Sequence, residues 1–131
     1  MSVLDTDILI GLIRKDPDAL EKLQELAEKG DAVKTTVINA CELYKGAFLS
    51  EEPSKEQKRI EGLLRNMGHI SLTTDLAPAI GQISPEMERA GTPMSDFDVM
   101  IAMMTSEAGE ILITRNVRHF ERLKGLSVET W

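Results

Sequence analysis

The chain has 131 residues, which is close to the commonest size of one domain, and 42% of them are hydrophobic, so it is no disordered protein. Its one cysteine excludes an intrachain disulfide and a cysteine-rich zinc site, and its two histidines argue against a histidine-based metal site. The net charge of −7 argues against a basic coat for nucleic acid, and 4% aromatic residues are too few for a base-stacking platform.

Apolar strands and amphipathic helices are expected to alternate along the chain. In the first half of the chain the pattern predicts a strand at 2–5, helices at 7–14 and 16–29, a strand at 32–36, and helices at 37–49 and 55–67. In the second half it predicts a weak strand at 69–72, a helix at 75–90 and another from the GTPMSDFD segment to 108. A buried strand at 110–114, a helix at 117–125 and a strand at 126–131 complete the chain. This order indicates an α/β fold in one domain, residues 1–131, with a parallel sheet covered on both faces.

Three carboxylates fall at the edges of segments that are expected to be buried. Asp5 ends the first strand, Glu42 lies within the apolar stretch TTVINACELYKGAF, and Asp98 opens the apolar run DVMIAMM. A carboxylate beside a core element is costly unless it is paired or bound to a metal. Since ligands of parallel sheets bind beyond the carboxyl ends of the strands, these acids suggest one pocket for a hard divalent cation such as Mg²⁺.

Ordinary roles compete with this interpretation. Asp7 is expected only to cap the helix that it opens, and Asp5 could cap the same helix. Glu42 could be a surface residue paired with Lys45, although Ile38 and Leu49 on the same helix face suggest that this face is partly covered.

The later candidates also have structural explanations. Ser95 and Asp98 match a variant of the capping box, and Asn116 could cap the short helix after it. His119 is expected to be a packed or exposed histidine rather than a substrate ligand. The arginines that follow the fourth strand could be ordinary surface charges: Arg115, Arg118 and Arg122.

Four segments together resemble the PIN-domain ribonucleases, and specifically the toxins of VapBC-type toxin–antitoxin pairs. They cover nearly the whole chain and read LDTDILI, TTVINACELYKGA, GTPMSDFDVMIAMM and EILITRNVRHFERLKGLSVETW. Each motif alone is a weak signal, whereas four in this order and spacing are a strong one.

The resemblance implies a three-layer α/β/α PIN-like fold with a central parallel sheet, and a Mg²⁺- or Mn²⁺-dependent endoribonuclease that acts as a toxin. It places the family's catalytic and metal-binding acids on Asp5, Glu42 and Asp98. Asn116 falls on a fourth metal position, with Thr114 as a supporting hydroxyl, and Asp96 on an additional acid. Many members carry Asp at the fourth position, so Asn116 puts a second metal ion in doubt.

The resemblance also implies an RNA substrate, a small VapB-type antitoxin and a homodimer. Plausible phosphate contacts are Lys45, Arg14, Arg115 and Arg118. Several apolar residues at 44–68 are expected to escape full coverage by the core and so to mark an interface: Phe48, Leu49, Ile60, Leu63 and Leu64. A basic antitoxin side chain that reaches Asp5 and Asp98 is the expected inhibitor.

Two alternatives remain open at the level of sequence. The chain could be a PIN-like interaction domain that has lost its activity, which Asn116 slightly favours. It could also be a haloacid-dehalogenase-like phosphatase, because VLDTDIL resembles the D-x-D start of that class with Asp5 as the nucleophile. No run approaches the ~20 apolar residues of a membrane span, and the first residues do not resemble a signal peptide, so we expect a cytoplasmic protein.

Overall fold

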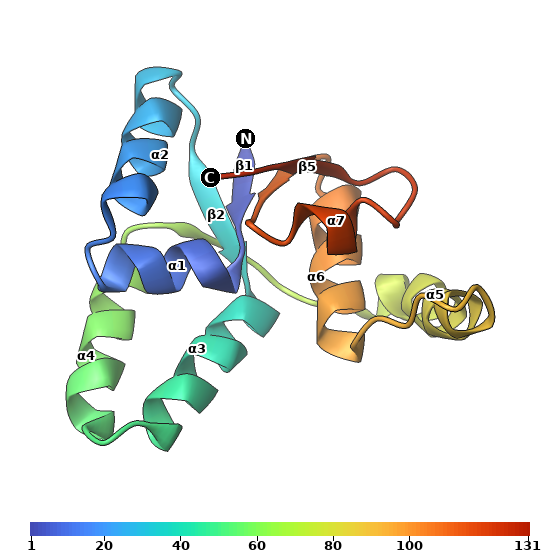
Figure 1. Cartoon of the computed structure of the whole chain (residues 1–131), viewed down its shortest axis with the longest axis horizontal. Helices are drawn as coiled ribbons and strands as arrows, with labels where there is room; N and C mark the ends of the chain where they lie inside the picture. Colours follow the sequence, from blue (N-terminus) through green and yellow to red (C-terminus); the bar gives the residue numbers. More distant parts are fainter.

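A five-stranded parallel sheet forms the centre of the computed structural model, which describes all 131 residues (Figure 1). The strands are β1 (Ser2–Leu4), β2 (Val33–Thr36), β3 (Gly68–Ile70), β4 (Ile111–Ile113) and β5 (Ser127–Glu129). Their order is β3-β2-β1-β4-β5, and every neighbouring pair is parallel. All carboxyl ends therefore meet at one edge, with β1 and β4 side by side in the middle.

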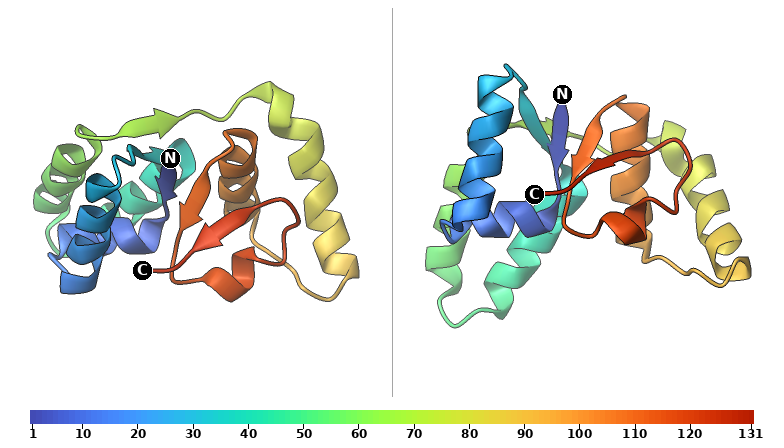
Figure 2. Two further views of the ribbon diagram at one scale, coloured as in Figure 1. Left: turned by 90° about the horizontal axis from the view of Figure 1, so that it is seen from above. Right: turned by 45° about the horizontal axis from the view of Figure 1, so that its top comes forward.

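Helices cover both faces of the sheet (Figure 2). They are α1 (Thr6–Ile13), α2 (Pro17–Glu28), α3 (Val37–Leu49), α4 (Pro53–Leu64), the 3₁₀ turn η1 (Thr74–Leu76), α5 (Ala77–Arg89), α6 (Asp96–Glu107) and α7 (Val117–Phe120). The expected three-layer arrangement is confirmed. No helix is both long enough and apolar enough to cross a membrane.

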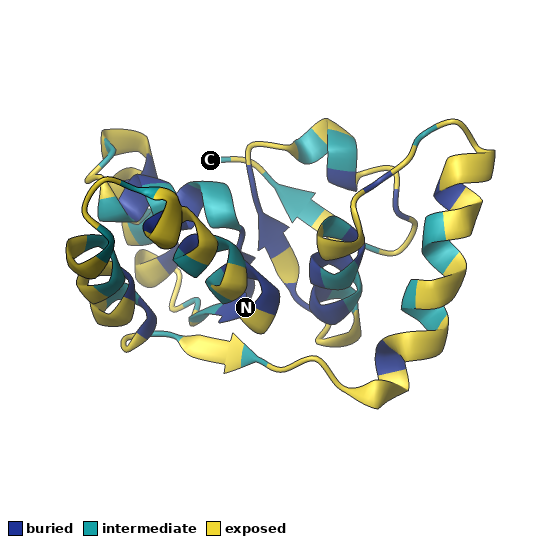
Figure 3. Cartoon of the chain, turned by 90° about the horizontal axis from the view of Figure 1, so that it is seen from below, coloured by how far each residue is buried: buried dark blue, intermediate teal, exposed yellow.

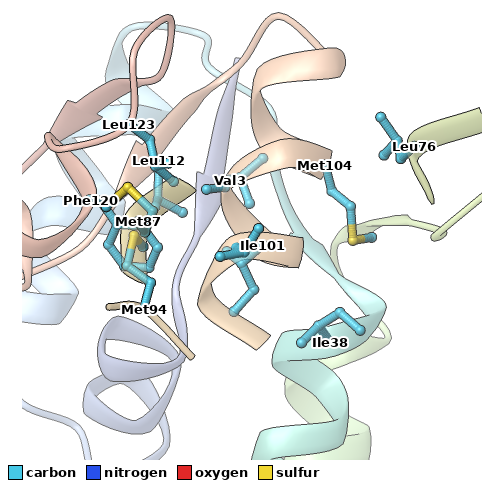
Figure 4. Close-up of a cluster of buried hydrophobic side chains, with 12 residues drawn as sticks. Val3, Ile38, Leu76, Met87, Met94, Ile101, Met104, Leu112, Phe120 and Leu123 are labelled. Carbon is cyan, nitrogen blue, oxygen red and sulfur yellow. The ribbon is translucent and has the colours of Figure 1, made fainter. Parts of the chain in front are cut away.

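Two hydrophobic clusters lie on opposite faces of the sheet because successive side chains of a strand point to opposite sides. Val3 and Leu112 face the cluster around α6, which Phe120 helps to close (Figure 4). Leu4 and Ile113 face the cluster built by α1, α2, α3 and α4. These buried neighbours fix the central strands, so the residues that follow β1 and β4 have well-defined positions.

Local signals in the sequence explain most helix boundaries. The Asp16 side chain caps the start of α2, where Pro17 occupies the first position. Thr36 and Asn39 form a reciprocal capping box at the start of α3, and the Ser95 hydroxyl accepts the Asp98 N–H at the start of α6. These caps place α3 and α6 directly at the carboxyl edge of the sheet.

Two expectations about the helices were wrong. The helix expected at 117–125 ends at Phe120, which is anchored in the core, and the chain then turns through Gly125 at φ +84° into β5. The expectation that the apolar residues of α3 and α4 escape coverage by the core was wrong for α4. Phe48 and Leu49 are exposed, as expected for an interface. Ile60 and Leu64 were expected to escape coverage and are instead buried against α1 and α3, because α4 packs closely on these helices.

Helix α5 is the least covered helix of the fold. Met87 is its only buried residue, while Ile80 and Ile83 are partly buried against the core. Figure 3 shows this largely exposed helix along one side of the molecule. Its neighbour is α6, so α5 extends the layer on that face of the sheet without reaching the centre of the carboxyl edge.

Candidate active site

Asp5 lies at the centre of the carboxyl edge, directly after β1. Its carboxylate accepts hydrogen bonds from the Thr6 N–H at 2.8 Å, the Asn39 amide at 3.0 Å and the Thr114 hydroxyl at 2.7 Å. Thr114 follows β4, the strand beside β1, and Asn39 belongs to the first turn of α3. The sheet and one capped helix thus hold this carboxylate from three sides, with only 7% of the residue exposed.

The protonation of Asp5 is strongly perturbed. The pKa of its carboxyl is raised from 3.8 to about 6. Burial is the largest cause of the rise, the hydrogen bonds from Thr114 and Thr6 oppose it, and the nearby carboxylates of Asp7 and Glu42 add to it. The dominant cause is therefore the loss of water around the anion. A positive charge beside Asp5 would offset this cost.

Glu42 is linked to Asp5 by a short series of hydrogen bonds. The Thr6 hydroxyl donates to Glu42 at 2.7 Å, and the Asn39 amide donates to the Thr6 hydroxyl at 3.0 Å. The alternative ion pair with Lys45 does not form. Helix α3 therefore places Glu42 beside Asp5.

Asp98 points toward His119 instead of joining Asp5. Its carboxylate lies 2.9 Å from the His119 Nε2 atom, at the start of α6. Asp96 is exposed and accepts from the Ser84 hydroxyl at 3.2 Å. No group of three or more His, Cys, Asp or Glu side chains is close enough to hold a metal ion in this arrangement. The structure thus brings Asp5 and Glu42 together and leaves Asp98 and Asp96 at the margin.

The segment after β4 approaches Asp5 through Thr114. Asn116 is exposed, and its side chain makes no capping hydrogen bond at the start of α7, so the alternative role as a helix cap is not observed. The expectation for Asp7 is wrong. Asp5 caps α1, whereas the Asp7 carboxylate accepts from Thr114, from the Arg115 N–H and from the Trp131 indole.

The residues predicted to contact RNA phosphates differ in how free their charged groups are to bind a ligand. Lys45, Arg14 and Arg118 are exposed and form no ion pair. Arg115 is engaged within the fold, since its guanidinium pairs with Asp18 at 3.1 Å and lies 3.5 Å from the centre of the Trp131 ring. A cleft of about 280 Å³ between α1, α3 and α4 contains both Arg14 and Glu42, so it connects one free cation with the acidic site.

Sequence reasoning missed two polar residues of this site. Asn39 and Thr6 link Asp5 to Glu42, and both lie inside the motifs that carried the resemblance. The T-x-x-N spacing of the capping box could have indicated Asn39, because its amide is fixed at the sheet edge. His119 was considered as packed or exposed, and its contact with Asp98 has no signal in the local sequence.

Comparison with known proteins agrees with this fold. Residues 2–126 match the family described as PIN domain. The chain is 31% identical to the tRNA(fMet)-specific endonuclease VapC of Salmonella typhimurium and 33% identical to the protein of that name from Shigella flexneri, over 98% of this chain and 96% of each relative.

Solved structures give the same result. The chain superposes on VapBC2 from Rickettsia felis, bound to a promoter DNA fragment, with a TM-score of 0.88, 26% identity, and coverage of 99% of this chain and 98% of that one. For DNA-bound VapBC from Salmonella typhimurium the TM-score is 0.85 with 31% identity, over 99% of this chain and 97% of that chain. The chain therefore belongs to the PIN-domain family, among the VapC-type ribonucleases.

Proposed function

We propose that this protein is the toxin of a toxin–antitoxin pair and cleaves RNA with the help of a divalent cation held at Asp5. The observation that carries the proposal is the buried Asp5 carboxylate, with its pKa raised to about 6, beside Glu42 at the carboxyl edge of the central strands. Perturbed carboxylates at such an edge are typical of functional sites.

The donor chemistry of the site fits a hard cation. Carboxylate and amide oxygens are the ligands that Mg²⁺ and Mn²⁺ prefer, and a cation would relieve the cost of the buried Asp5 charge. Asp5 and Glu42 would hold it, with Asn116 at the margin. The Asp98 carboxylate would join them if it turned away from His119. The exposed Asp96 carboxylate would join them if it gave up its hydrogen bond from Ser84. Bound there, Mg²⁺ or Mn²⁺ would supply charge stabilisation and a water of lowered pKa.

The protein residues would orient the reacting groups. Asn39 and Thr6 fix the two carboxylates relative to each other, so their acceptor atoms can align an attacking water without reorganising. The Thr114 hydroxyl holds the second oxygen of Asp5. These contacts fix Asp5 and Glu42 before RNA binds, which lowers the entropic part of the barrier.

We extend the proposal to a tRNA substrate because two of the relatives are described as tRNA(fMet)-specific endonucleases. Free cations near the site would bind its phosphates, namely Arg14, Lys45 and Arg118. Arg115 is less suited to this role because Asp18 and Trp131 already engage its guanidinium. A substrate of this kind is found in the cytoplasm, where we expect the protein to act.

A VapB-type antitoxin and a second copy of the chain complete the proposal. The solved relatives are toxin–antitoxin complexes. The cleft between α1, α3 and α4 is about half apolar and reaches Glu42, so it suits an amphipathic segment with a basic side chain directed at the acidic site. Phe48 and Leu49 remain exposed at the end of α3 and would contribute to the contact between copies.

Incubation of the purified protein with a tRNA pool tests this function. Cleavage with Mg²⁺ or Mn²⁺, its loss with a chelator and its recovery on renewed addition of the cation are the expected results. Equal cleavage with and without the chelator would contradict the cation requirement, and intact tRNA under all conditions would contradict the tRNA substrate. A parallel incubation with messenger RNA distinguishes another RNA target from an inactive protein.

A further inference from the structure

We propose that Asp7 and Trp131 are positioning residues of the ribonuclease site, which hold the Thr114–Asn116 turn against Asp5. The proposal rests on the proposed function for its activity test, and on hydrogen bonds of this chain for its geometry. Neither residue would touch the RNA. Their role is to connect the segment after β1 with the segment after β4.

The Asp7 carboxylate has two polar neighbours in this turn and a third in Trp131. One carboxylate oxygen accepts from the Arg115 backbone N–H at 2.8 Å and lies 3.1 Å from the Thr114 hydroxyl, and the other accepts from the Trp131 indole at 2.8 Å. A hydrogen bond between a charged acceptor and a backbone donor is stronger than a neutral one. Asp7 therefore fixes the backbone of the turn that carries Asn116.

The Thr114 hydroxyl lies between two carboxylates. It is 2.7 Å from Asp5 and 3.1 Å from Asp7, and it accepts the Asn116 N–H at 3.0 Å. A hydroxyl has one hydrogen to donate, and the shorter distance assigns it to Asp5. The Arg115 N–H is then the main link from Asp7 to the turn, so the position of Thr114 depends on the orientation of the Asp7 carboxylate.

Trp131 sets that orientation because its own position is constrained. The Arg115 guanidinium lies 3.5 Å from its ring centre, and the Arg115 Nε donates to the Trp131 carbonyl at 3.3 Å. On α1, Gly11 leaves room for the ring, since a Cβ there would lie 3.1 Å from the Trp131 Cη2 atom. The indole N–H is thereby directed at Asp7.

The effect on catalysis follows from geometry. A site in which a carboxylate must meet a cation and a phosphate loses rate when its supporting contacts loosen, commonly by about 10-fold or more for a residue that orients a ligand. Substrate affinity depends on other groups and stays unchanged. A positioning role therefore predicts a lower kcat at constant KM.

The variant Trp131→Phe tests this directly because it keeps an aromatic ring and removes the indole N–H. We expect kcat for RNA to fall about 10-fold, with KM and the melting temperature nearly unchanged. Asp7→Asn, which also loses an acceptor for the turn, should lower kcat further. Glu88→Gln is the control, since Glu88 is an exposed carboxylate on α5 that contacts neither Asp7 nor Arg115, and it should leave kcat unchanged.

A second measurement keeps the test independent of ribonuclease activity. Amide hydrogen exchange at Arg115 should become faster in Trp131→Phe and Asp7→Asn, and not in Glu88→Gln, because the Arg115 N–H donates to Asp7. Unchanged exchange, or a wild-type kcat in Trp131→Phe, would overturn the proposal. If the wild-type protein cleaves no RNA, the proposed function fails, and the exchange data alone decide whether this contact holds the turn.

Discussion

At the scale of single residues, the site depends on one carboxylate that is held in an unfavourable environment. Asp5 is fixed by Thr6, Asn39 and Thr114, and its burial opposes ionisation. In the proposed function a cation beside Asp5 would offset this cost, because a positive charge favours the ionised carboxylate. Stability and the proposed function therefore conflict at this position, and the free energy of unfolding should depend measurably on pH.

The pKa of about 6 for Asp5, against 3.8 as its ordinary value, predicts that its ionisation lowers stability as pH rises through this window. The folded state binds the proton more tightly than the unfolded state, so the cost grows to about 3 kcal/mol above pH 7. Asp5→Asn removes this cost and keeps an acceptor for Asn39 and a donor for Thr114. It should abolish cleavage yet raise the free energy of unfolding.

Urea unfolding in the presence of a chelator measures this effect. The gain from Asp5→Asn should be larger at pH 7.5 than at pH 5, by about 1 kcal/mol. An equal gain at both values would mean that Asp5 titrates normally in the folded state. A loss of stability at both would show that the amide is not accommodated between Asn39 and Thr114.

A substitution at Asn116 can add a carboxylate to the site, whereas Asp5→Asn removes one. Its side chain is exposed and makes no capping hydrogen bond, so Asn116→Asp adds a carboxylate without breaking a contact. We expect tighter binding of Mn²⁺, because a charged ligand replaces a neutral one. Calorimetric titration of both forms measures this, and equal affinities would place residue 116 outside the cation site.

At the scale of helices and strands, the end of α3 and its turn into α4 expose apolar side chains. Phe48 is 64% exposed and Leu49 78% exposed, whereas Leu64 on α4 is only 9% exposed. An interface test must therefore change the first two residues. A charge at Leu64 would be buried in the core and would unfold the protein rather than report on association.

The double variant Phe48→Asp and Leu49→Asp should convert a dimer to a monomer without loss of helix content. Light scattering at tens of micromolar measures the mass, and circular dichroism checks the fold. Leu20→Asp is the matched control, because Leu20 is an exposed apolar residue on α2, away from this surface. A monomeric wild-type protein, or an unchanged dimer in the double variant, would show that this surface does not mediate dimerisation.

At the scale of the whole molecule, the sequence predicted the order of strands and helices along the chain and placed Asp5 and Thr114 at the ends of parallel strands. The order of the strands within the sheet, which puts β1 beside β4, was not predicted. Buried strands, helix caps and the position of Pro17 are local signals, and they determined most boundaries. The contact between His119 and Asp98 and the hydrogen bond from Trp131 to Asp7 could not be predicted. They join residues that are 21 and 124 positions apart and depend on side-chain orientation.

The same limit applies to exposure. Leu49 and Leu64 have the same side chain and lie in neighbouring helices. The packing of α4 on α1 and α3 alone decides which of them is buried. Hydrophobic periodicity assigns a residue to a helix face and cannot say whether another element covers that face.

The binding of Mn²⁺ by wild-type protein and by Asp98→Asn tests the central claim most directly, because Asp98 contacts His119 in this structure and is expected to serve the cation. Calorimetric titration should give one specific site in the wild-type protein and in the control Glu88→Gln, whose exposed side chain lies on α5. Asp98→Asn should weaken binding by about 10-fold or more. Equal affinity in Asp98→Asn would exclude Asp98 from the cation site, and no specific binding by the wild-type protein would contradict the account and indicate an inactive interaction domain.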